Sequence, residues 1–401
     1  MAIRVGSIAF GDDFFDRKTE RQDMWRYLGG NHIVFSGPRR LGKSSILQRL
    51  TEEGREKGML TRLIDVQGLD RAEDFITHLA AAFPENTVAG YLKKIGSAVR
   101  SLTSNTQVNI SLPDGSSAGI QLPPLPETPW RDEAVKLQQR LAPVPVLILI
   151  DEFTVFLEKL LAHDKSEAER LLSWLRAWRS APQTACRFVF SGSIGFDSLL
   201  EQHNLSTLFN DCHEFHLGPF HKDIALSMLK EVAWREEKWK LEDAVANHLC
   251  QRVGWLSPFY LNLLLDQSLA AGRDREMECA SIENPQQLTT DDIENGYERL
   301  LSVRSRFIHW YKRLQRDLPE PDFSFACAVL SAVAREKSGQ GLTRTQLRAR
   351  LQRQTPDPDE RRRQLDRILV KLQEDGYLGQ TEERIAFLSF LLRDYWRRNH
   401  G

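Results

Sequence analysis

The clearest chemical pattern in the sequence is a glycine-bounded loop that ends in lysine and serine. Residues 36–45 read Ser-Gly-Pro-Arg-Arg-Leu-Gly-Lys-Ser-Ser, which has the spacing G-x-x-x-x-G-K-[ST]. Glycine at both ends lets the backbone turn tightly, and the loop amides and a following helix N-terminus favour an anion. Such a loop would bind the phosphates of a nucleotide. Its predicted contact residues are Gly37, Pro38, Arg39, Arg40, Leu41, Gly42, Lys43, Ser44 and Ser45.

Two side chains of this loop have specific roles in the prediction. The ammonium of Lys43 suits the β- and γ-phosphates of a nucleoside triphosphate, and the hydroxyl of Ser44 suits Mg²⁺. The alternative is a chance match in a turn. The flanking residues disfavour it, because 32–36 reads as a short buried strand and the apolar residues of 46–50 recur at helical spacing.

Two adjacent acids, Asp151 and Glu152, follow the apolar run 146–150. A continuous apolar run of this length predicts a central parallel strand that is buried on both faces. Asp151 would then hold Mg²⁺ through water, and Glu152 would polarise the water that attacks the γ-phosphate. The alternative is a solvated acidic turn, which a phosphate-binding loop elsewhere in the chain makes less attractive.

The elements that must position these residues alternate between strands and helices. A helix that ends near Gly29 precedes the first strand. Further strands are predicted at 60–66, 187–193 and 215–217, and helices at 72–82, 130–141 and 166–179. This alternation predicts an α/β fold of the P-loop type, with a doubly wound parallel sheet and helices on both faces.

Residues 84–128 interrupt the alternation. Polar and apolar residues alternate over 107–112, Pro113-Asp114-Gly115 predicts a turn, and 119–122 runs back. We therefore expect a hairpin insertion within about 84–128, closed by a cluster of prolines. It is either a surface elaboration, which is the simpler interpretation, or a site for a partner.

After residue 220 only helices are predicted until about 301, at 225–234, 241–253, 259–269 and 291–301. Thr289 and Asp292 have the spacing of a capping box at the last of them. From about 319, helices at 323–333, 342–351 and 359–374 precede a short hairpin over 376–378 and 384–387. We therefore predict a P-loop core at 1–220, a helical lid at 221–318 and a winged helix-turn-helix at 319–401.

The composition is that of a globular protein. The 401 residues are 41% hydrophobic and 27% charged, with a net charge of −1. The longest apolar run, 146–150, is too short to span a bilayer, and the N-terminus lacks the apolar core of a signal peptide. We therefore expect a cytoplasmic protein that does not engage a membrane.

Cysteine usage points to the same compartment. The five cysteines are scattered, which fits a reducing environment without a disulfide framework; they are Cys186, Cys212, Cys250, Cys279 and Cys327. Cys212, His213 and His216 lie close enough in sequence to suggest zinc. Their stretch reads better as a strand, so Mg²⁺ is the only metal in the prediction.

Together these motifs resemble the archaeal-type P-loop ATPases of the STAND class, signal-transducing relatives of the additional-strand, AAA-like ATPases. The resemblance covers nearly the whole chain. It is carried by Phe15-Asp16-Arg17 with Glu20, the loop 37–45, Ile150-Asp151-Glu152, Phe190 to Gly195, Asn210-Asp211, Gly254 to Leu261 and Phe390 to Trp396. It implies a slow, partner-stimulated, Mg²⁺-dependent ATPase that acts as a switch. ATP closes the lid and the winged helix onto the core, and hydrolysis releases them.

The resemblance implies further contacts with ATP. A polar residue at the end of the 187–193 strand, Ser191 or Ser193, would sit between the two motif strands and sense the γ-phosphate. The segment that contains Arg17 would pack by the adenine. A lid proline would touch the nucleotide, which is Pro258 here, although its spacing from Gly254 departs from the usual pattern. A proline that merely starts a helix is an equally good interpretation.

Two absences from the sequence refine the resemblance. The approach to Phe215 contains no arginine, so a closed ring with an arginine finger from a neighbouring subunit is not predicted. The chain also lacks an N/T-K-x-D guanine signature, which favours ATP over GTP. Other modes of oligomerisation stay open.

Two functions are consistent with these features. The first is an ATP-driven switch that regulates an effector protein in a DNA-linked or defence-related process. The second is a DNA-binding regulator of the replication or transposition type, in which ATP tunes DNA affinity. A scaffold with a nucleotide that is never turned over is a weaker third, because the adjacent acids argue for hydrolysis.

The second function depends on the basic C-terminal region. Over 301–401, 20 Lys and Arg residues outnumber 13 Asp and Glu residues. A recognition helix would present such cations to DNA, here Arg361, Arg362, Arg363, Arg367 and Lys371. Acids are interleaved with them, so a winged helix that packs on a protein partner is also consistent.

Overall fold

The computed structural model describes residues 3, 5–9, 11–102, 130–181, 184–192, 195–278, 286–302, 307–336 and 339–400. The chain forms two compact units. The sheet unit consists of Arg17–Ser36 and Ser44–His216. The helical unit consists of Met1–Asp16, Gly37–Lys43 and Leu217–Gly401. The loop 37–43 thus belongs to the helical unit, although it connects two elements of the sheet unit's fold.

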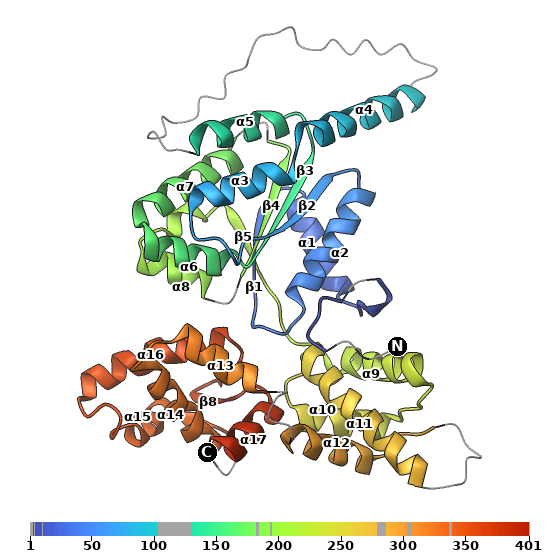
Figure 1. Cartoon of the computed structure of the whole chain (residues 1–401), viewed down its shortest axis with the longest axis vertical. Helices are drawn as coiled ribbons and strands as arrows, with labels where there is room; N and C mark the ends of the chain where they lie inside the picture. The colour runs from blue at the N-terminus through green and yellow to red at the C-terminus, as the bar shows by residue number, and fades with distance from the viewer. Residues whose placement is uncertain are drawn as a thin grey trace. The chain divides into compact units, whose positions relative to one another are not determined.

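The sheet unit is built on five parallel strands in the order β2-β3-β4-β1-β5 (Figure 1). Every residue of β3 is buried, as expected for a continuous apolar run with helices on both faces. The predicted doubly wound parallel sheet is therefore confirmed. The strand bounds are β1 His32–Ser36, β2 Leu60–Asp65, β3 Val146–Asp151, β4 Cys186–Ser191 and β5 Cys212–His216.

The last strand lies earlier than predicted. β5 spans Cys212–His216 rather than 215–217, so it contains the residues that had suggested zinc. Alternate side chains of a strand point to opposite faces, which separates His213 from its two neighbours in that group. His213 instead stacks on Tyr27, with ring centroids 3.5 Å apart. Among the described residues, no three His, Cys, Asp or Glu side chains are grouped so that they could hold a metal ion.

Helices cover both faces of the sheet. Figure 1 shows α1 (Lys18–Leu28) and α2 (Lys43–Glu56) on one face, and α3 (Ala72–Ala82), α6 (Phe153–His163) and α7 (Lys165–Arg179) on the other. The unit also contains α5 (Arg131–Leu141), α8 (Phe196–Gln202) and the 3₁₀ turn η2 (Ser206–Leu208). The sequence did not predict α6. Its N-terminal flank, Glu152, provides no side-chain cap, so the usual start signal is missing.

The region of the expected insertion begins as a helix. Residues Glu85–Leu102 form α4, where the sequence pattern suggested the start of a hairpin segment. The expected hairpin strands at 107–112 and 119–122 lie outside the described residues. The hairpin itself therefore stays a prediction.

A buried ion pair connects α7 to the segment before β5. Arg179, whose side chain is fully buried, donates from Nε to Asp211 Oδ2 at 2.8 Å. The guanidinium also lies 4.5 Å from the ring centroid of Phe209. Burial alone would raise the pKa of Asp211, but the hydrogen bonds and charge of Arg179 hold that pKa below its usual value. Asp211 thus stabilises the sheet unit.

The first element of the helical unit is the turn η1 (Gly11–Asp13), and from α9 to α13 the described elements of this unit are all helices. They are α9 (Lys222–Glu237), α10 (Asp243–Val253), α11 (Pro258–Glu278), α12 (Thr290–Ser302) and α13 (Ile308–Asp317). The predicted capping box is confirmed. Asp292 N donates to Thr289 Oγ1 at 3.3 Å, and Thr289 N donates to Asp292 Oδ2 at 2.9 Å.

The C-terminal elements have the order of a winged helix-turn-helix, but Leu342–Thr343 form a strand where the sequence predicted a helix, so the sheet has three strands rather than the predicted two. The elements are α14 (Asp322–Ala334), β6 (Leu342–Thr343), α15 (Arg344–Arg350), α16 (Pro358–Glu374), β7 (Leu378–Thr381) and β8 (Arg384–Phe387), followed by α17 (Phe390–Asn399). The strands form an antiparallel sheet in the order β6-β8-β7. α17 connects this region to α12, because Tyr297 donates to Asp394 Oδ2 at 2.7 Å. The three-domain division stays a prediction, since the lid and winged-helix elements share one unit.

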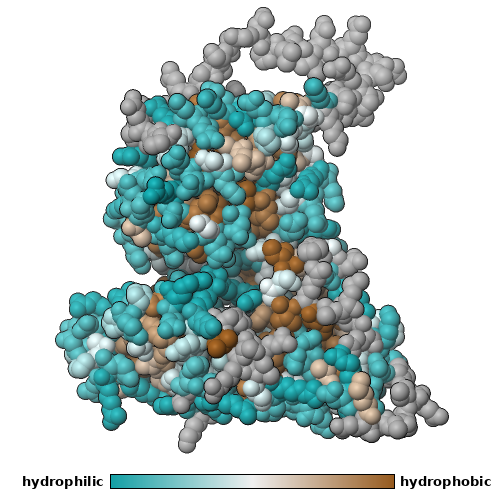
Figure 2. All heavy atoms as spheres, in the orientation of Figure 1, coloured by the Kyte–Doolittle hydropathy of each residue, from teal (hydrophilic) through white to brown (hydrophobic). Residues whose placement is uncertain are grey.

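Hydrophilic side chains cover most of the described helices on the face that Figure 2 presents. Most of the large apolar side chains are inside the units, and Trp174, Trp239 and Trp396 are among the largest that are fully buried, whereas Trp234 and Met277 are exposed. In the part of the chain that the structure describes, no helix combines the length and apolar character needed to cross a membrane.

Candidate functional site

The loop of residues 37–42 forms the whole connection between β1 and α2. Gly42 has a φ of +90°, which side chains other than glycine rarely adopt. At Gly37 a Cβ atom would approach Leu217 O to 2.9 Å, closer than real contacts allow. The conformation and close packing of the backbone therefore require glycine at both positions. The predicted succession of strand, tight loop and helix is confirmed.

Lys43 holds this loop in a closed turn. Its Nζ atom donates to Gly37 O at 2.6 Å and to Pro38 O at 3.1 Å. The ammonium thus lies inside the curve of the loop, at the first residue of α2. A cation and a helix N-terminus at the same place form a site that suits an anion.

The two predicted acids end β3. Asp151 is the last residue of the strand and is 9% exposed, and its Oδ1 accepts a hydrogen bond from Glu152 N at 3.0 Å. Glu152 has a φ of +56°, in the left-handed region that non-glycine residues seldom occupy. Such backbone strain is often found at functional sites, because the surrounding structure must hold the residue in place.

The end of β4 brings two buried hydroxyl groups together around a glycine. Ser191 and Thr154 are each 1% exposed, and neither hydroxyl has a hydrogen-bond partner among the described residues. At Gly192 a Cβ atom would lie 1.8 Å from Thr154 Oγ1, so the start of α6 packs directly on the end of β4. Sequence reasoning missed Thr154. The alternative γ-phosphate sensor Ser193 lies outside the described residues.

Strand order places these groups along one edge of the sheet, here called the carboxyl edge. β4 lies between β1 and β3. Phe35 of β1 pairs with Ser191, and Ile150 of β3 pairs with Phe190. Ser191 therefore lies at the end of a strand that is flanked by the strand leading into the loop and the strand ending in acids, and its role toward the γ-phosphate stays a prediction.

The donor set of the sheet unit fits Mg²⁺. Ser44 begins the part of α2 that belongs to this unit, and Asp151 ends β3. A hydroxyl and a carboxylate are oxygen ligands, which Mg²⁺ prefers, and a magnesium site normally completes its coordination with waters and phosphate oxygens. Two protein ligands are thus enough for a metal that arrives with a nucleotide.

Two other predicted residues, Arg17 and Pro258, have evident structural roles. Arg17 is 3% exposed, has a φ of +56°, and donates to Glu20 Oε1 at 2.6 Å at the start of α1. Pro258 is the first residue of α11. Its neighbour Ser257, fully buried, donates to Arg40 O at 2.6 Å and so contacts the loop directly. The sequence did not single out Ser257, and a contact of Pro258 with nucleotide stays a prediction.

The two arginines of the loop contact the helical unit. Arg39 Nε donates to Asp375 Oδ1 at 3.1 Å, and the Arg40 guanidinium lies 4.4 Å from the ring centroid of Phe259. Burial lowers the pKa of Arg40 from its usual value. Asp375 had no signal in the sequence, because its role depends on a contact between residues far apart in the chain.

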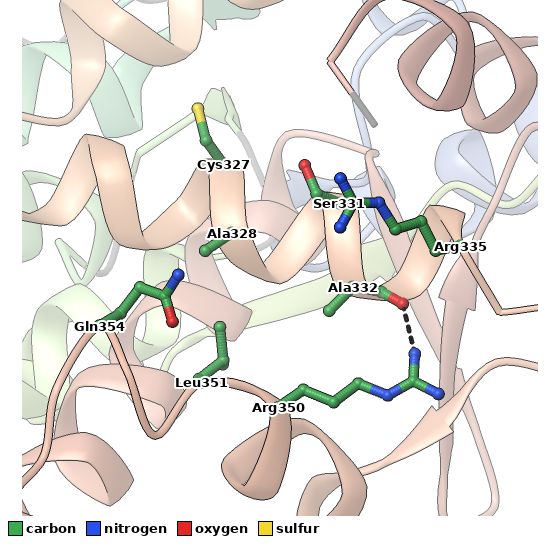
Figure 3. Close-up of a pocket in the computed structure, with 8 residues that line it drawn as sticks. All are labelled: Cys327, Ala328, Ser331, Ala332, Arg335, Arg350, Leu351 and Gln354. Carbon is green, nitrogen blue, oxygen red and sulfur yellow. Dashed lines mark hydrogen bonds between the residues drawn. The ribbon is translucent and has the colours of Figure 1, made fainter.

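A surface cavity lies away from these residues. A hollow of about 540 Å³ lies between α14 and α15, and Figure 3 shows Arg350 across it, donating to Ala332 O at 2.9 Å. None of the loop residues 37–43 lines it. Arg335 and Arg350 are both exposed there, so the hollow has the character of an ordinary surface groove.

Comparison with known proteins supports the fold. No protein-family model matches the chain, and no curated protein sequence matches it. A Walker-type ATPase of Pyrococcus abyssi is similar with a TM-score of 0.63 and 18% identity, over 99% of this chain and 100% of that one. The ORC2 protein of Aeropyrum pernix, solved as ADPNP–ADP complexes, is similar with a TM-score of 0.53 and 13% identity, over 97% of this chain and 95% of that one. The chain thus has the α/β P-loop fold of Walker-type ATPases.

Proposed function

We propose that this protein is an ATP-driven switch that binds ATP with Mg²⁺ at residues 37–45 and hydrolyses it. The observation that carries the proposal is the strand order. It brings the phosphate-binding loop after β1, the hydroxyl of Ser191 after β4 and the acids after β3 to the carboxyl edge of one sheet. Binding a triphosphate needs the loop, and hydrolysis needs the acids and the polar group between them.

The loop residues bind and orient the triphosphate. Backbone amides of 37–44 cradle the phosphates at the N-terminus of α2, which has a partial positive charge. Lys43 already has its ammonium inside the curve of the loop, so it supplies charge to the β- and γ-phosphates without a large rearrangement. The same pre-organisation explains why both glycines are needed.

The acids orient the other reactants. Ser44 and Asp151 hold the metal, which neutralises charge on the phosphate oxygens when it is bound. Glu152 accepts a hydrogen bond from the attacking water. The oxygen of this water forms the new bond to the γ-phosphorus as the bond between the γ-phosphorus and the bridging oxygen breaks. Ser191 donates its hydroxyl to the γ-phosphate, which gives its buried polar group a partner.

Arg17 and Pro258 are proposed to border the bound nucleotide through the segments that they shape. The buried ion pair of Arg17 with Glu20 fixes the turn before α1, on the adenine side of the site. Pro258 starts α11 directly after Ser257, which contacts the loop. In this proposal both act by positioning backbone.

The switch is proposed to resemble the STAND class in its logic. ATP and ADP states would differ in the contacts of the lid and the winged helix, and an effector protein would read that difference. An effector in a separate protein is consistent with a chain that carries no nuclease or protease motif. We place its role in a DNA-linked or defence-related process.

The deciding experiment is an ATP turnover assay with the purified full chain, with and without Mg²⁺. We expect slow, Mg²⁺-dependent release of phosphate and none above background for Lys43→Ala, because the triphosphate would lose its main cation. Exposed Lys93 provides a matched control, since Lys93→Ala removes a lysine outside the site. Equal turnover by the wild type and Lys43→Ala would refute the proposal.

A second candidate function, DNA binding in which ATP tunes affinity, is favoured by one observation. Arg362 and Arg363 on α16 are exposed. Arg362 has an ion-pair distance of 4.0 Å to Asp359 Oδ1, whereas Arg367 donates to both carboxylate oxygens of Asp322 at 2.7 Å and Arg361 donates to Thr355 O. The exposed pair is therefore the part of α16 that would contact phosphates or base edges.

A further inference from the structure

The outer side of the phosphate loop is held by an ion pair with the C-terminal region. Arg39 Nε and Asp375 Oδ1 are 3.1 Å apart, and their side chains are 17% and 3% exposed. Both residues belong to the helical unit. The loss of either partner should be felt, because a partly buried charge is costly once an oppositely charged neighbour is removed.

The turn after α16 fits closely against the loop. Asp375 caps the C-terminus of α16, and Gly376 follows with a φ of +79°. A Cβ atom at Gly376 would lie 3.6 Å from Pro38 Cβ and 3.7 Å from Arg39 O. The turn at Gly376 therefore lies beside the loop with room for one methyl group between them, and the ion pair is part of a broader contact.

A second contact holds the next residue of the loop. Ser257 donates to Arg40 O at 2.6 Å, and the Arg40 guanidinium lies over Phe259. The loop is thus held from the outside by α16 and by the start of α11, and from the inside by Lys43. All three contacts therefore help to fix the curvature of the loop.

We propose that Asp375 is a positioning residue through which the winged helix and the nucleotide influence each other, with Arg39 as the link. This inference rests on the proposed function. The carboxylate of Asp375 holds Arg39 on the outer side of the loop in the curved form that accepts phosphate. Nucleotide stabilises the same curvature from the inside. By thermodynamic linkage, each therefore strengthens the other.

The sign of the coupling follows from the geometry. Lys43 already lies inside the curve while Arg39 is paired with Asp375, so the ion pair accompanies the form that is ready for phosphate. Removing the carboxylate should loosen that form and weaken nucleotide binding. If Asp375 instead drew Arg39 away from phosphate, removing its carboxylate would strengthen nucleotide binding.

The test is equilibrium binding of mant-ATP with Mg²⁺ to the full chain, followed by fluorescence. We expect Asp375→Asn to raise Kd about tenfold, within the usual range of coupling between two sites. Asp375→Glu, which keeps the carboxylate, should restore part of the affinity. The matched control is Asp322→Asn, which removes the acid of the Arg367–Asp322 pair elsewhere in the same unit and should leave Kd unchanged.

A double-mutant cycle separates a link from a general loss of structure. Arg39→Gln alone should also raise Kd. The double variant Arg39→Gln/Asp375→Asn should have a Kd no higher than that of the single variant with the higher Kd. Thermal unfolding without nucleotide identifies a variant that fails to fold, and Asp375→Glu then carries the test. Wild-type affinity in Asp375→Asn, tighter binding, or fully additive effects would each overturn the inference. A wild type that ignores mant-ATP would overturn the proposed function first.

Discussion

Phe35 of β1 and Ser191 of β4 are direct partners in parallel register. Phe35 is the second-to-last residue of β1, so Ser191 lies next to the point where the phosphate loop begins. Its hydroxyl is buried and has no hydrogen-bond partner among the described residues, and the same holds for Thr154. Because Ser191 lies next to the loop, its hydroxyl is placed to serve a bound group, as the proposed function requires.

This relationship leads to a prediction about stability and turnover. Thr154→Val replaces an unpartnered hydroxyl with a methyl group of similar volume, so the free energy of unfolding should rise by roughly 1 kcal/mol. Ser191→Ala should be close to neutral in stability and should slow ATP turnover. Thermal unfolding and a phosphate-release assay measure the two effects. A Thr154→Val variant that is less stable than the wild type would show that the hydroxyl already has a partner.

Glu152 should be needed for turnover and dispensable for binding. In Glu152→Gln the amide cannot act as a base toward water, and hydrolysis should slow by roughly 10²–10⁴-fold. Mant-ATP affinity should stay within a few-fold of wild type, because the loop is intact. Glu169→Gln on the exposed face of α7 is the control. Full turnover in Glu152→Gln would remove Glu152 from the mechanism.

Acid should destabilise the sheet unit through His32. This residue at the start of β1 accepts from Phe188 N at Nδ1 (3.1 Å), and its Nε2 lies 3.3 Å from Arg179 O, so the neutral ring fits. Burial, and then the nearby charge of Arg179, lower the pKa of His32 from 6.5 to about 4. The unfolded chain therefore binds more protons between these values, and stability falls as pH falls through that window.

The expected loss is on the order of 3 kcal/mol between neutral pH and pH 4, if the whole shift is realised. Urea unfolding at a series of pH values measures it. His32→Gln cannot titrate, so its stability should depend less steeply on pH across the same window. Parallel curves for the wild type and His32→Gln would assign the pH dependence to other groups.

The exposed arginines of α16 allow a test of DNA binding. If the winged helix contacts DNA, Arg362→Ala/Arg363→Ala should weaken binding to a duplex, and the slope of log K against log salt should become shallower by about one per lost phosphate contact. Arg397→Ala, also exposed but on α17, serves as the control. Binding that is absent, or insensitive to salt, would favour a protein partner for this surface.

Local patterns in the sequence were enough for the core of the site. The loop 37–45, the buried run of β3 and the acids after it are each defined by neighbouring residues, and the alternation of elements predicted the sheet. Periodicity also found the capping box at α12. These features depend on chemistry that is contiguous along the chain.

Other features depended on contacts that no local pattern contains. Thr154 becomes notable only because α6 packs against Gly192, and Asp375 only because α16 ends beside the loop. Helix α6 itself was missed because it begins after a strained glutamate without a capping side chain. Long-range packing, rather than propensity, decides all three.

The grouping of residues 37–43 with the C-terminal region has a practical consequence. A chain cut after residue 220 would keep all five strands of the large sheet, Asp151 and Glu152, and would look like a self-sufficient ATPase domain by its motifs. It would lack Ser257 and Asp375, the side chains that hold Arg40 and Arg39. We expect such a fragment to bind nucleotide poorly, so a negative result from it would say nothing about the intact molecule.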